Sequence, residues 1–162
     1  MLSQKVERLL PRAEPERLFD IAADVERYPE FLRWWIAARV ERREVNAYYT
    51  EQVLGLGPLR VRFSSKTILE RPARIEVISH EPPFRRFGLI WAFTPEPSAG
   101  CRVSLAAELE LHSGLLQRLV AAVLPGAVAD IVAAFEARTR ELEALAARTR
   151  PGKHRRHRGG PR

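Results

Sequence analysis

Residues 101–135 read CRVSLAAELELHSGLLQRLVAAVLPGAVADIVAAF, and the period of their apolar residues changes partway along. Up to Leu111 the odd positions are apolar and most even positions are polar, which is typical of a strand with one buried face. Beyond Ser113, which can cap a helix, leucine, valine and isoleucine recur every three or four residues. The stretch therefore predicts a half-buried strand followed directly by a long apolar helix that continues to Leu145.

The alternation of the first part extends back through the chain. From Leu59 onward apolar residues keep mostly to odd positions, and turn sequences such as Val45-Asn46 and Gly55-Leu56-Gly57-Pro58 separate the segments of the chain. Consecutive strands with short turns favour an antiparallel sheet. The predicted strands are 4–10, 34–44, 47–54, 59–69, 75–79, 87–93 and 103–111.

A short helix is predicted before most of these strands. Glu14-Pro15-Glu16 is a typical helix start, with proline in the first turn and acidic residues near the positive end of the helix dipole. Tyr28-Pro29 should break or bend this helix, and Pro125-Gly126 should kink or break the long one. The predicted fold class is α+β, a curved antiparallel sheet of six to seven strands with a long C-terminal helix across its apolar face. The space between sheet and helix is the expected ligand site.

The net charge of +7 is unevenly distributed along the 162 residues. Seven basic residues and no acidic ones lie in 148–162, which leaves 20 basic and 20 acidic residues in 1–147. We therefore predict one ligand-binding domain over 1–147 and a basic, disordered tail over 148–162. The basic residues of the tail are Arg148, Arg150, Lys153, Arg155, Arg156, Arg158 and Arg162.

One segment carries a family resemblance. Residues 18–32, LFDIAADVERYPEFL, resemble the opening motif of the coenzyme Q-binding protein family, within the START-like polyketide cyclase/dehydrase superfamily. Three later segments (65–77, 83–93 and 101–103) and the helix segment 134–138 are also similar, so the resemblance covers roughly 4–145 in order. The sequence departs from the family at Arg33-Trp34-Trp35, where Pro-Trp-Cys is usual, and in the basic tail.

The resemblance implies a helix-grip fold that binds ubiquinone or a related polyisoprenoid lipid and supports respiration as a lipid chaperone, without a required cofactor. Bacterial relatives of that family include the ribosome association toxin, which is said to hinder subunit joining. A ribosome-associated regulator is therefore the alternative function. Superfamily membership also leaves a polyketide cyclase-like enzyme, which would need a polar group deep in the pocket.

The apolar side chains expected to face the cavity are the candidate ligand-binding residues. Aromatic rings suit a flat quinone head, although each of these residues could instead serve only to fill the core. The break at Pro125-Gly126 could let part of the helix move to admit a lipid. The candidates are Tyr28, Phe31, Trp34, Trp35, Phe63, Trp91, Phe93, Leu105, Leu119, Val123, Val128 and Phe135.

Signals of catalysis are sparse. His80 and His112 lack metal-ligand spacing, Cys101 lacks an activating partner, and phosphate-loop and serine-nucleophile motifs are missing, so we expect a protein that is not an enzyme. A single cysteine, with neither a signal peptide nor a span of about 20 apolar residues, favours the cytoplasm. The tail could bind ribosomal RNA or an anionic membrane, so peripheral attachment to the inner membrane is an option.

Overall fold

The computed structural model describes residues 1–56 and 58–150. Seven strands form one antiparallel sheet in the order β1-β7-β6-β5-β4-β3-β2, so neighbouring strands in the sheet are consecutive in sequence except at β1, which pairs with β7. Three helical segments complete the fold. The elements are β1 (Leu2–Leu10), α1 (Pro15–Ala23), the 3₁₀ helix η1 (Val25–Glu30), β2 (Trp35–Glu44), β3 (Ala47–Leu56), β4 (Leu59–Glu70), β5 (Arg74–Ser79), β6 (Phe84–Glu96), β7 (Gly100–Leu111) and α2 (Gly114–Thr149).

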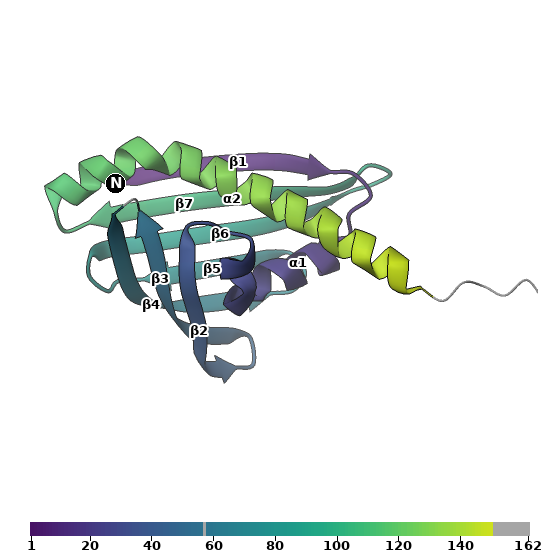
Figure 1. Cartoon of the computed structure of the whole chain (residues 1–162), viewed down its shortest axis with the longest axis horizontal. Coiled ribbons are helices and arrows are strands. Elements are labelled where there is room, and N and C mark those ends of the chain that lie inside the picture. Colours follow the sequence, from purple (N-terminus) through teal and green to yellow (C-terminus); the bar gives the residue numbers. More distant parts are fainter. Residues whose placement is uncertain (57, 151–162) are drawn as a thin grey trace, which may run out of the picture.

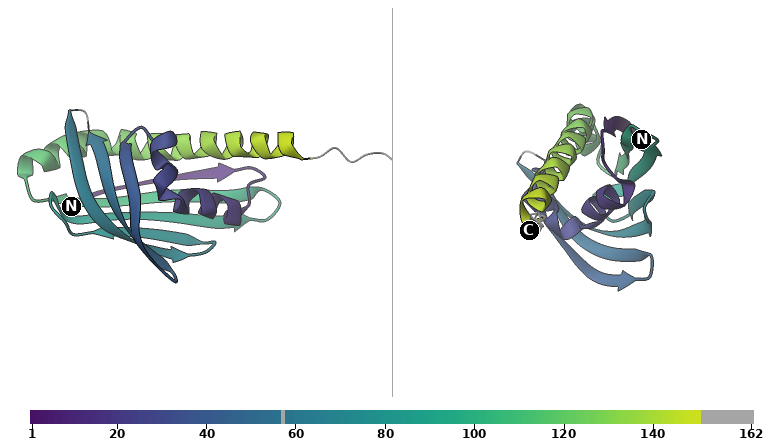
Figure 2. Two further views of the ribbon diagram at one scale, coloured as in Figure 1. Left: turned by 60° about the horizontal axis from the view of Figure 1, so that its bottom comes forward. Right: turned by 90° about the vertical axis from the view of Figure 1, so that its right-hand side faces the viewer.

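The sheet curves around α2. In Figure 1 the strands β1, β7 and β6 run along the helix, whereas β2, β3 and β4 cross their direction steeply. Figure 2 shows α2 lying along the concave side of the sheet, with α1 and η1 closing one end. The predicted helix-grip architecture is confirmed, because a curved antiparallel sheet holds one long C-terminal helix.

The alternation seen in the sequence separates the two faces of the sheet. In β7 every odd residue from Cys101 to Leu111 is buried and every even residue is partly exposed. In β4 the same parity holds from Val61 to Thr67, but Leu59 at the start of the strand is exposed. The odd positions of β4 and β7 therefore face α2, whereas in β3 the even positions do. The inward face is mostly apolar, with a polar group on β3 and β4 and Ser79 on β5.

The N-terminal helical region begins where predicted, but it consists of two separate helices. Pro15 occupies the first turn of α1, which ends at Ala23. Tyr28 and Pro29 lie inside the separate helix η1, so the chain changes helix type before it reaches the proline. Together α1 and η1 cover the end of the sheet between β2 and β6.

The long helix α2 begins as predicted, because the Ser113 hydroxyl accepts a hydrogen bond from the Leu116 amide at 3.3 Å. Pro125 lies inside an unbroken helix, so the structure has no break there; Figure 1 shows the axis changing direction in the N-terminal third. The helix continues to Thr149, and Arg148 and Thr149 therefore belong to it rather than to the predicted tail. The rest of that tail, 151–162, lies outside the described residues.

Candidate functional site

An apolar cavity of about 70 Å³ lies between α2 and the concave face of the sheet. Its walls come from the segment leading into β2, from β3, β6 and β7, and from the N-terminal half of α2. A water molecule occupies about 30 Å³ in the liquid, whereas ligand sites commonly measure about 300–1,000 Å³. The lining residues are Trp34, Trp35, Leu54, Phe84, Phe87, Leu89, Ala107, Leu109, Val120, Val123, Leu124, Ala127, Val128 and Ile131.

A second, more open cleft of about 300 Å³ lies against the outer side of the same wall. Trp34 and Ile131 line both the cleft and the inner cavity, so these two side chains separate them. An ion pair of 2.5 Å between Arg33 and Asp130 joins the chain before β2 to α2 across the cleft. The Arg33 guanidinium also lies 4.9 Å from the centre of the Trp34 ring.

The two neighbouring tryptophans differ in their hydrogen bonding. Trp35 Nε1 donates to Gln52 Oε1 at 2.7 Å, and Gln52 Nε2 donates to Ser65 Oγ at 2.7 Å. Trp34 Nε1 is buried and has no acceptor among the described residues. A buried donor without a partner loses its hydration and gains nothing in return, at a cost of about 1–3 kcal/mol. Trp34 Nε1 is therefore a buried donor beside the cavity that lacks a partner in this conformation, while the surface of the cavity itself is wholly apolar.

Two buried tyrosines fix the N-terminal helical region, because Tyr28 joins η1 to α1 and Tyr48 joins α1 to β3. The Tyr28 hydroxyl donates to the Ala22 carbonyl, and the Tyr48 hydroxyl donates to the Ala23 carbonyl at 2.8 Å. Burial raises the pKa of Tyr28 well above its ordinary value and raises that of Tyr48 to about 12. Both phenols are therefore protonated structural donors at neutral pH.

Of the predicted ligand-binding residues, Trp34, Trp35, Val123 and Val128 line the cavity. Trp91, Phe93 and Phe135 instead pack on one another, with 6.2 Å between the ring centres of Trp91 and Phe93 and 4.9 Å between those of Trp91 and Phe135. These three rings fill the far end of the space under α2, because large side chains from both layers meet there. They are core residues in this conformation.

The remaining predicted residues lie around the cavity rather than in its wall. Phe63 contacts Phe84 and Phe87 from behind, at 5.1 and 4.8 Å between ring centres. Leu105 and Tyr28 are buried in the core, and Phe31 lies in the outer clefts. Leu119 is on the outward side of α2 and exposed, since a helix stripe this wide extends past the part that faces the sheet.

Sequence reasoning missed most of the residues that form the cavity wall. Alternation placed Leu89, Ala107 and Leu109 on the correct face, but it does not show where opposing side chains fail to meet. Helical spacing likewise did not distinguish Val120 and Leu124 from the residues of the same stripe that only fill the core. Small size is the signal that could have identified Ala107 and Ala127, because alanine opposite a helix leaves room. The missed residues are Leu54, Phe84, Phe87, Leu89, Ala107, Leu109, Val120, Leu124, Ala127 and Ile131.

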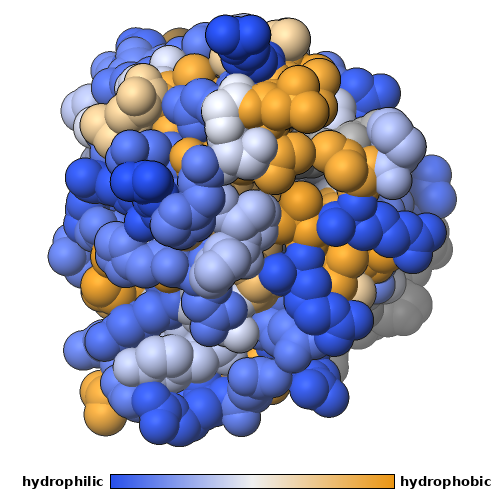
Figure 3. Space-filling view, turned by 90° about the vertical axis from the view of Figure 1, so that its left-hand side faces the viewer, coloured by the Kyte–Doolittle hydropathy of each residue, from blue (hydrophilic) through white to orange (hydrophobic). Residues whose placement is uncertain are grey.

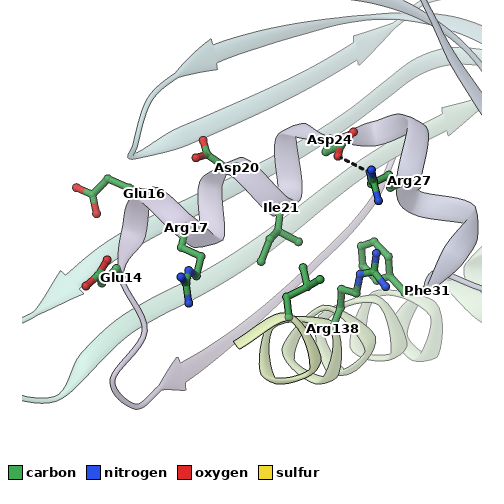
Figure 4. A pocket seen from close by; sticks show the side chains of 10 residues that line it. Glu14, Glu16, Arg17, Asp20, Ile21, Asp24, Arg27, Phe31 and Arg138 are labelled. Carbon is green, nitrogen blue, oxygen red and sulfur yellow. Dashed lines mark ion pairs between the residues drawn. The ribbon is translucent and has the colours of Figure 1, made fainter. Parts of the chain in front are cut away.

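A larger surface cleft of about 480 Å³ lies between α1, η1 and the C-terminal half of α2 (Figure 4). Seven of its ten lining residues are charged, with both signs present, and Glu14, Glu16 and Arg17 form no ion pair within the described residues. Arg138 pairs with Glu30 at 2.7 Å and lies over the Phe31 ring at 5.4 Å, and Asp24 pairs with Arg27 at 3.2 Å. Because most of its lining is charged, this cleft is a weaker candidate than the cavity for an apolar ligand.

Metal-binding and nucleophilic groups do not gather at either place. Within residues 1–56 and 58–150, no three His, Cys, Asp or Glu side chains lie close enough together to hold a metal ion. Cys101 is buried, and burial raises the pKa of its thiol, which lowers the fraction of reactive thiolate. The described site is thus suited to binding by shape and apolar contact.

Comparisons with known proteins agree with this geometry. A family model described as "Polyketide cyclase / dehydrase and lipid transport" matches residues 12–136. The ribosome association toxin RatA of Pseudomonas aeruginosa is 28% identical over 87% of this chain and 99% of its own. The 18 kDa protein CC1736 from Caulobacter crescentus is 31% identical, with a TM-score of 0.74 over 89% of this chain and 99% of that one. A START superfamily protein from Mycobacterium smegmatis shares the fold, with a TM-score of 0.67 at 16% identity over 87% of this chain and 97% of its own.

Proposed function

The chain belongs to the polyketide cyclase / dehydrase and lipid transport family, and from this premise we propose that it binds and carries an apolar ligand in the cavity under α2. The observation that carries the proposal is the composition of the cavity wall, in which all the lining side chains are apolar or aromatic. The inward polar groups, such as Gln52 and Ser65, pair with each other beside the cavity rather than within its wall. A wall of this kind favours apolar molecules over charged ones.

Within this class we propose a polyisoprenoid quinone such as ubiquinone, carried in support of respiration. A quinone has a flat ring, carbonyl acceptors and a branched apolar tail. The rings of Trp34, Trp35 and Phe84 offer flat surfaces. The unpaired indole donor of Trp34 is buried beside the cavity, and it would reach one carbonyl oxygen only once the Trp34 ring moves. The aliphatic side chains of α2 suit the tail. The resemblance in residues 18–32 supports the same ligand.

Binding of a molecule as large as a polyisoprenoid quinone requires the cavity to enlarge. The open volume of about 70 Å³ takes a few atoms, whereas the outer cleft beyond Trp34 adds about 300 Å³ if the two spaces join. The helix α2 packs mainly on β1 and β7, so its side toward β2 and β3 is the one free to separate. We therefore expect Trp34 and the N-terminal half of α2 to move when a ligand enters.

The proposal includes no catalytic step. Acid–base catalysis needs a titratable group within hydrogen-bond reach of the reacting atom. The side chains that line the cavity include no titratable group. This supports a carrier rather than a cyclase.

Organic extraction of the purified protein, followed by mass spectrometry, tests the proposal directly. We expect a co-purified isoprenoid lipid, and we expect protein stripped of lipid to take up ubiquinone with a stoichiometry close to one. The protein Val123→Lys, with a charge at the cavity wall, is the negative control and should take up much less. Protein that is consistently empty and also fails to bind added ubiquinone would disprove the quinone proposal.

Ribosome association is the second candidate function. The specific observation in its favour is the similarity to RatA over almost the whole length of that relative, together with the basic residues after Leu145. Co-sedimentation with ribosomal subunits, using the full chain and a chain ending at Arg150, tests it. We expect association at low salt that weakens as salt rises, because arginine–phosphate contacts release counterions. No association of either form at low salt would remove this candidate.

A further inference from the structure

The N-terminal half of α2 has an apolar side that the sheet does not cover. Leu115, Leu119 and Val123 are 69%, 49% and 39% exposed, and their spacing of four residues places them in one row along the helix. An 18-residue window of α2 has a mean hydropathy of 1.9, although only a third of that window is buried. The helix is thus more apolar than its packing on the sheet requires.

This row lies at the rim of the ligand cavity. Val123 is exposed and also lines the cavity, and Val120 and Leu124 beside it line the cavity as well. Figures 1 and 2 show the adjoining ends of β3 and β4 beside the same part of α2, and Leu59 at the start of β4 is 37% exposed. In Figure 3 apolar side chains gather on this end of the molecule next to hydrophilic ones.

The charges around the row are positive. Residues 112–129 contain no acidic residue, and Arg118 on α2 and Arg60 beside Leu59 are both exposed. Neither arginine forms an ion pair within the described part of the chain, although most of the other arginines there do. An exposed apolar row with unpaired cations near it is the pattern of a surface that rests on anionic lipid. Arg118 lies on the helix itself, and Arg60 lies at the tip of β4, on the other face of the strand from Leu59.

We propose that Leu59, Leu115, Leu119 and Val123, with Arg60 and Arg118, form a surface that docks on an anionic lipid bilayer. We call these six residues the rim surface. The apolar side chains enter the boundary between headgroups and acyl chains, and the two guanidinium groups contact lipid phosphates. The opposite side of α2 stays packed on the sheet, so the helix lies on the bilayer and does not cross it.

A second copy of the chain fits the rim surface less well than a bilayer does. A symmetric dimer through the same surface would place Arg60 and Arg118 of one copy near those of the other, because both copies use the same patch. Like charges in a dry interface are unfavourable, whereas phosphates neutralise them. The charge pattern therefore favours the bilayer.

Docking there gives the cavity a direct route to the lipid. Val123 belongs to both surfaces, so a ligand could pass between membrane and cavity without crossing water. The inference goes beyond the proposed ligand, since vesicle binding is measured on protein to which no ligand has been added. Failure of ubiquinone uptake would not contradict docking on the bilayer, and failure of vesicle binding would not contradict ligand binding in the cavity.

Vesicle flotation tests the inference, with vesicles of phosphatidylcholine alone and of phosphatidylcholine mixed with phosphatidylglycerol. We expect stronger binding to the mixed vesicles, and roughly tenfold weaker binding to them for the protein L115E/L119E. The protein R60E/R118E should lose the preference for mixed vesicles. The matched control is Val45→Glu, which changes an apolar residue that is 97% exposed in the turn between β2 and β3.

Circular dichroism establishes that each variant is folded, and both leucines are exposed, so their replacement should leave the fold intact. Binding of the control at the wild-type level, with loss in L115E/L119E, supports the rim surface. Equal binding by L115E/L119E and the wild type would overturn the inference. So would a concentration-dependent dimer that L115E/L119E dissociates while neither protein binds vesicles.

Discussion

Trp34 and Trp35 are neighbours in sequence, and both line the cavity, but only one indole nitrogen is paired. The Trp35 donor is satisfied by Gln52, which fixes that ring against β3. The Trp34 ring separates the cavity from the outer cleft and lacks such an anchor. The proposed specificity for an acceptor-bearing ligand therefore rests on one atom, Trp34 Nε1, which becomes available when the ring moves aside.

Replacing that donor gives the first prediction. Trp34→Phe keeps an aromatic ring in the wall and removes the N–H, so ubiquinone should bind roughly five- to tenfold more weakly, the equivalent of about 1–1.4 kcal/mol. Fluorescence titration or equilibrium dialysis measures the affinity. An isoprenoid hydrocarbon without oxygen is the control ligand, and its affinity should not fall. Equal losses for both ligands would show that the ring and not the donor matters.

Tyr48 provides a prediction on stability at high pH. Burial raises the pKa of Tyr48 to about 12 in the folded protein, whereas the ordinary pKa of a tyrosine is 10.0. The unfolded chain therefore ionises first, and the free energy of unfolding should fall between pH 10 and 12, by about 2–3 kcal/mol for this group. Below pH 10 the contribution is fully present.

Urea unfolding at pH 8, 10.5 and 11.5 measures this fall. Tyr48→Phe should be less stable at pH 8 by about 1 kcal/mol, because the hydrogen bond to the Ala23 carbonyl is lost. Its stability should also decline less steeply at high pH than that of the wild type. An identical decline in both proteins would show that other groups cause it.

Among the secondary structure elements, β7 and α2 show what the sequence can and cannot predict. Alternation in β7 identified its buried face completely, because the side-chain period of a strand is exact. The stripe of α2 was too wide to show which apolar residues face outward, and Leu119, which was predicted to face the cavity, is exposed on the outward side of the helix. The position of a cavity depends on how the side chains of opposing elements fit together. Neither the alternation of a strand nor the stripe of a helix contains that information.

The strand β7 also offers a matched pair of variants. Ala107 is buried and lines the cavity, whereas Ala106 is on the outer face of the same strand. Ala107→Leu should fill the cavity, change stability by no more than about 1–2 kcal/mol, and abolish ligand uptake. Ala106→Leu should leave uptake unchanged. Normal uptake by the Ala107 variant would place the ligand elsewhere.

Across the whole molecule, the two candidate contact surfaces lie at opposite ends of α2. The helix has 36 residues and is therefore about 54 Å long. The rim surface is at its N-terminal end, and Arg150, after which the remaining basic residues follow, is at its C-terminal end (Figure 2). Bilayer docking and any ribosome contact through the basic residues can thus be separated by truncation.

Truncation after Arg150 removes five of the basic residues and leaves α2 complete. We expect the shortened protein to bind mixed vesicles within about twofold of the full chain, because the rim surface is intact. Its co-sedimentation with ribosomal subunits should fall. Loss of vesicle binding on truncation would transfer the membrane contact from the rim surface to residues 151–162.

The pairing of β1 with β7 has a consequence for the order in which the chain is made. Leu10 lies opposite Cys101, so the first strand must wait for its partner until most of the chain has been synthesised. The helix that covers the concave face is made later still. Each newly made chain therefore passes through a stage in which that face is bare, and a lipid met at this stage would be enclosed as the helix packs down rather than admitted afterwards.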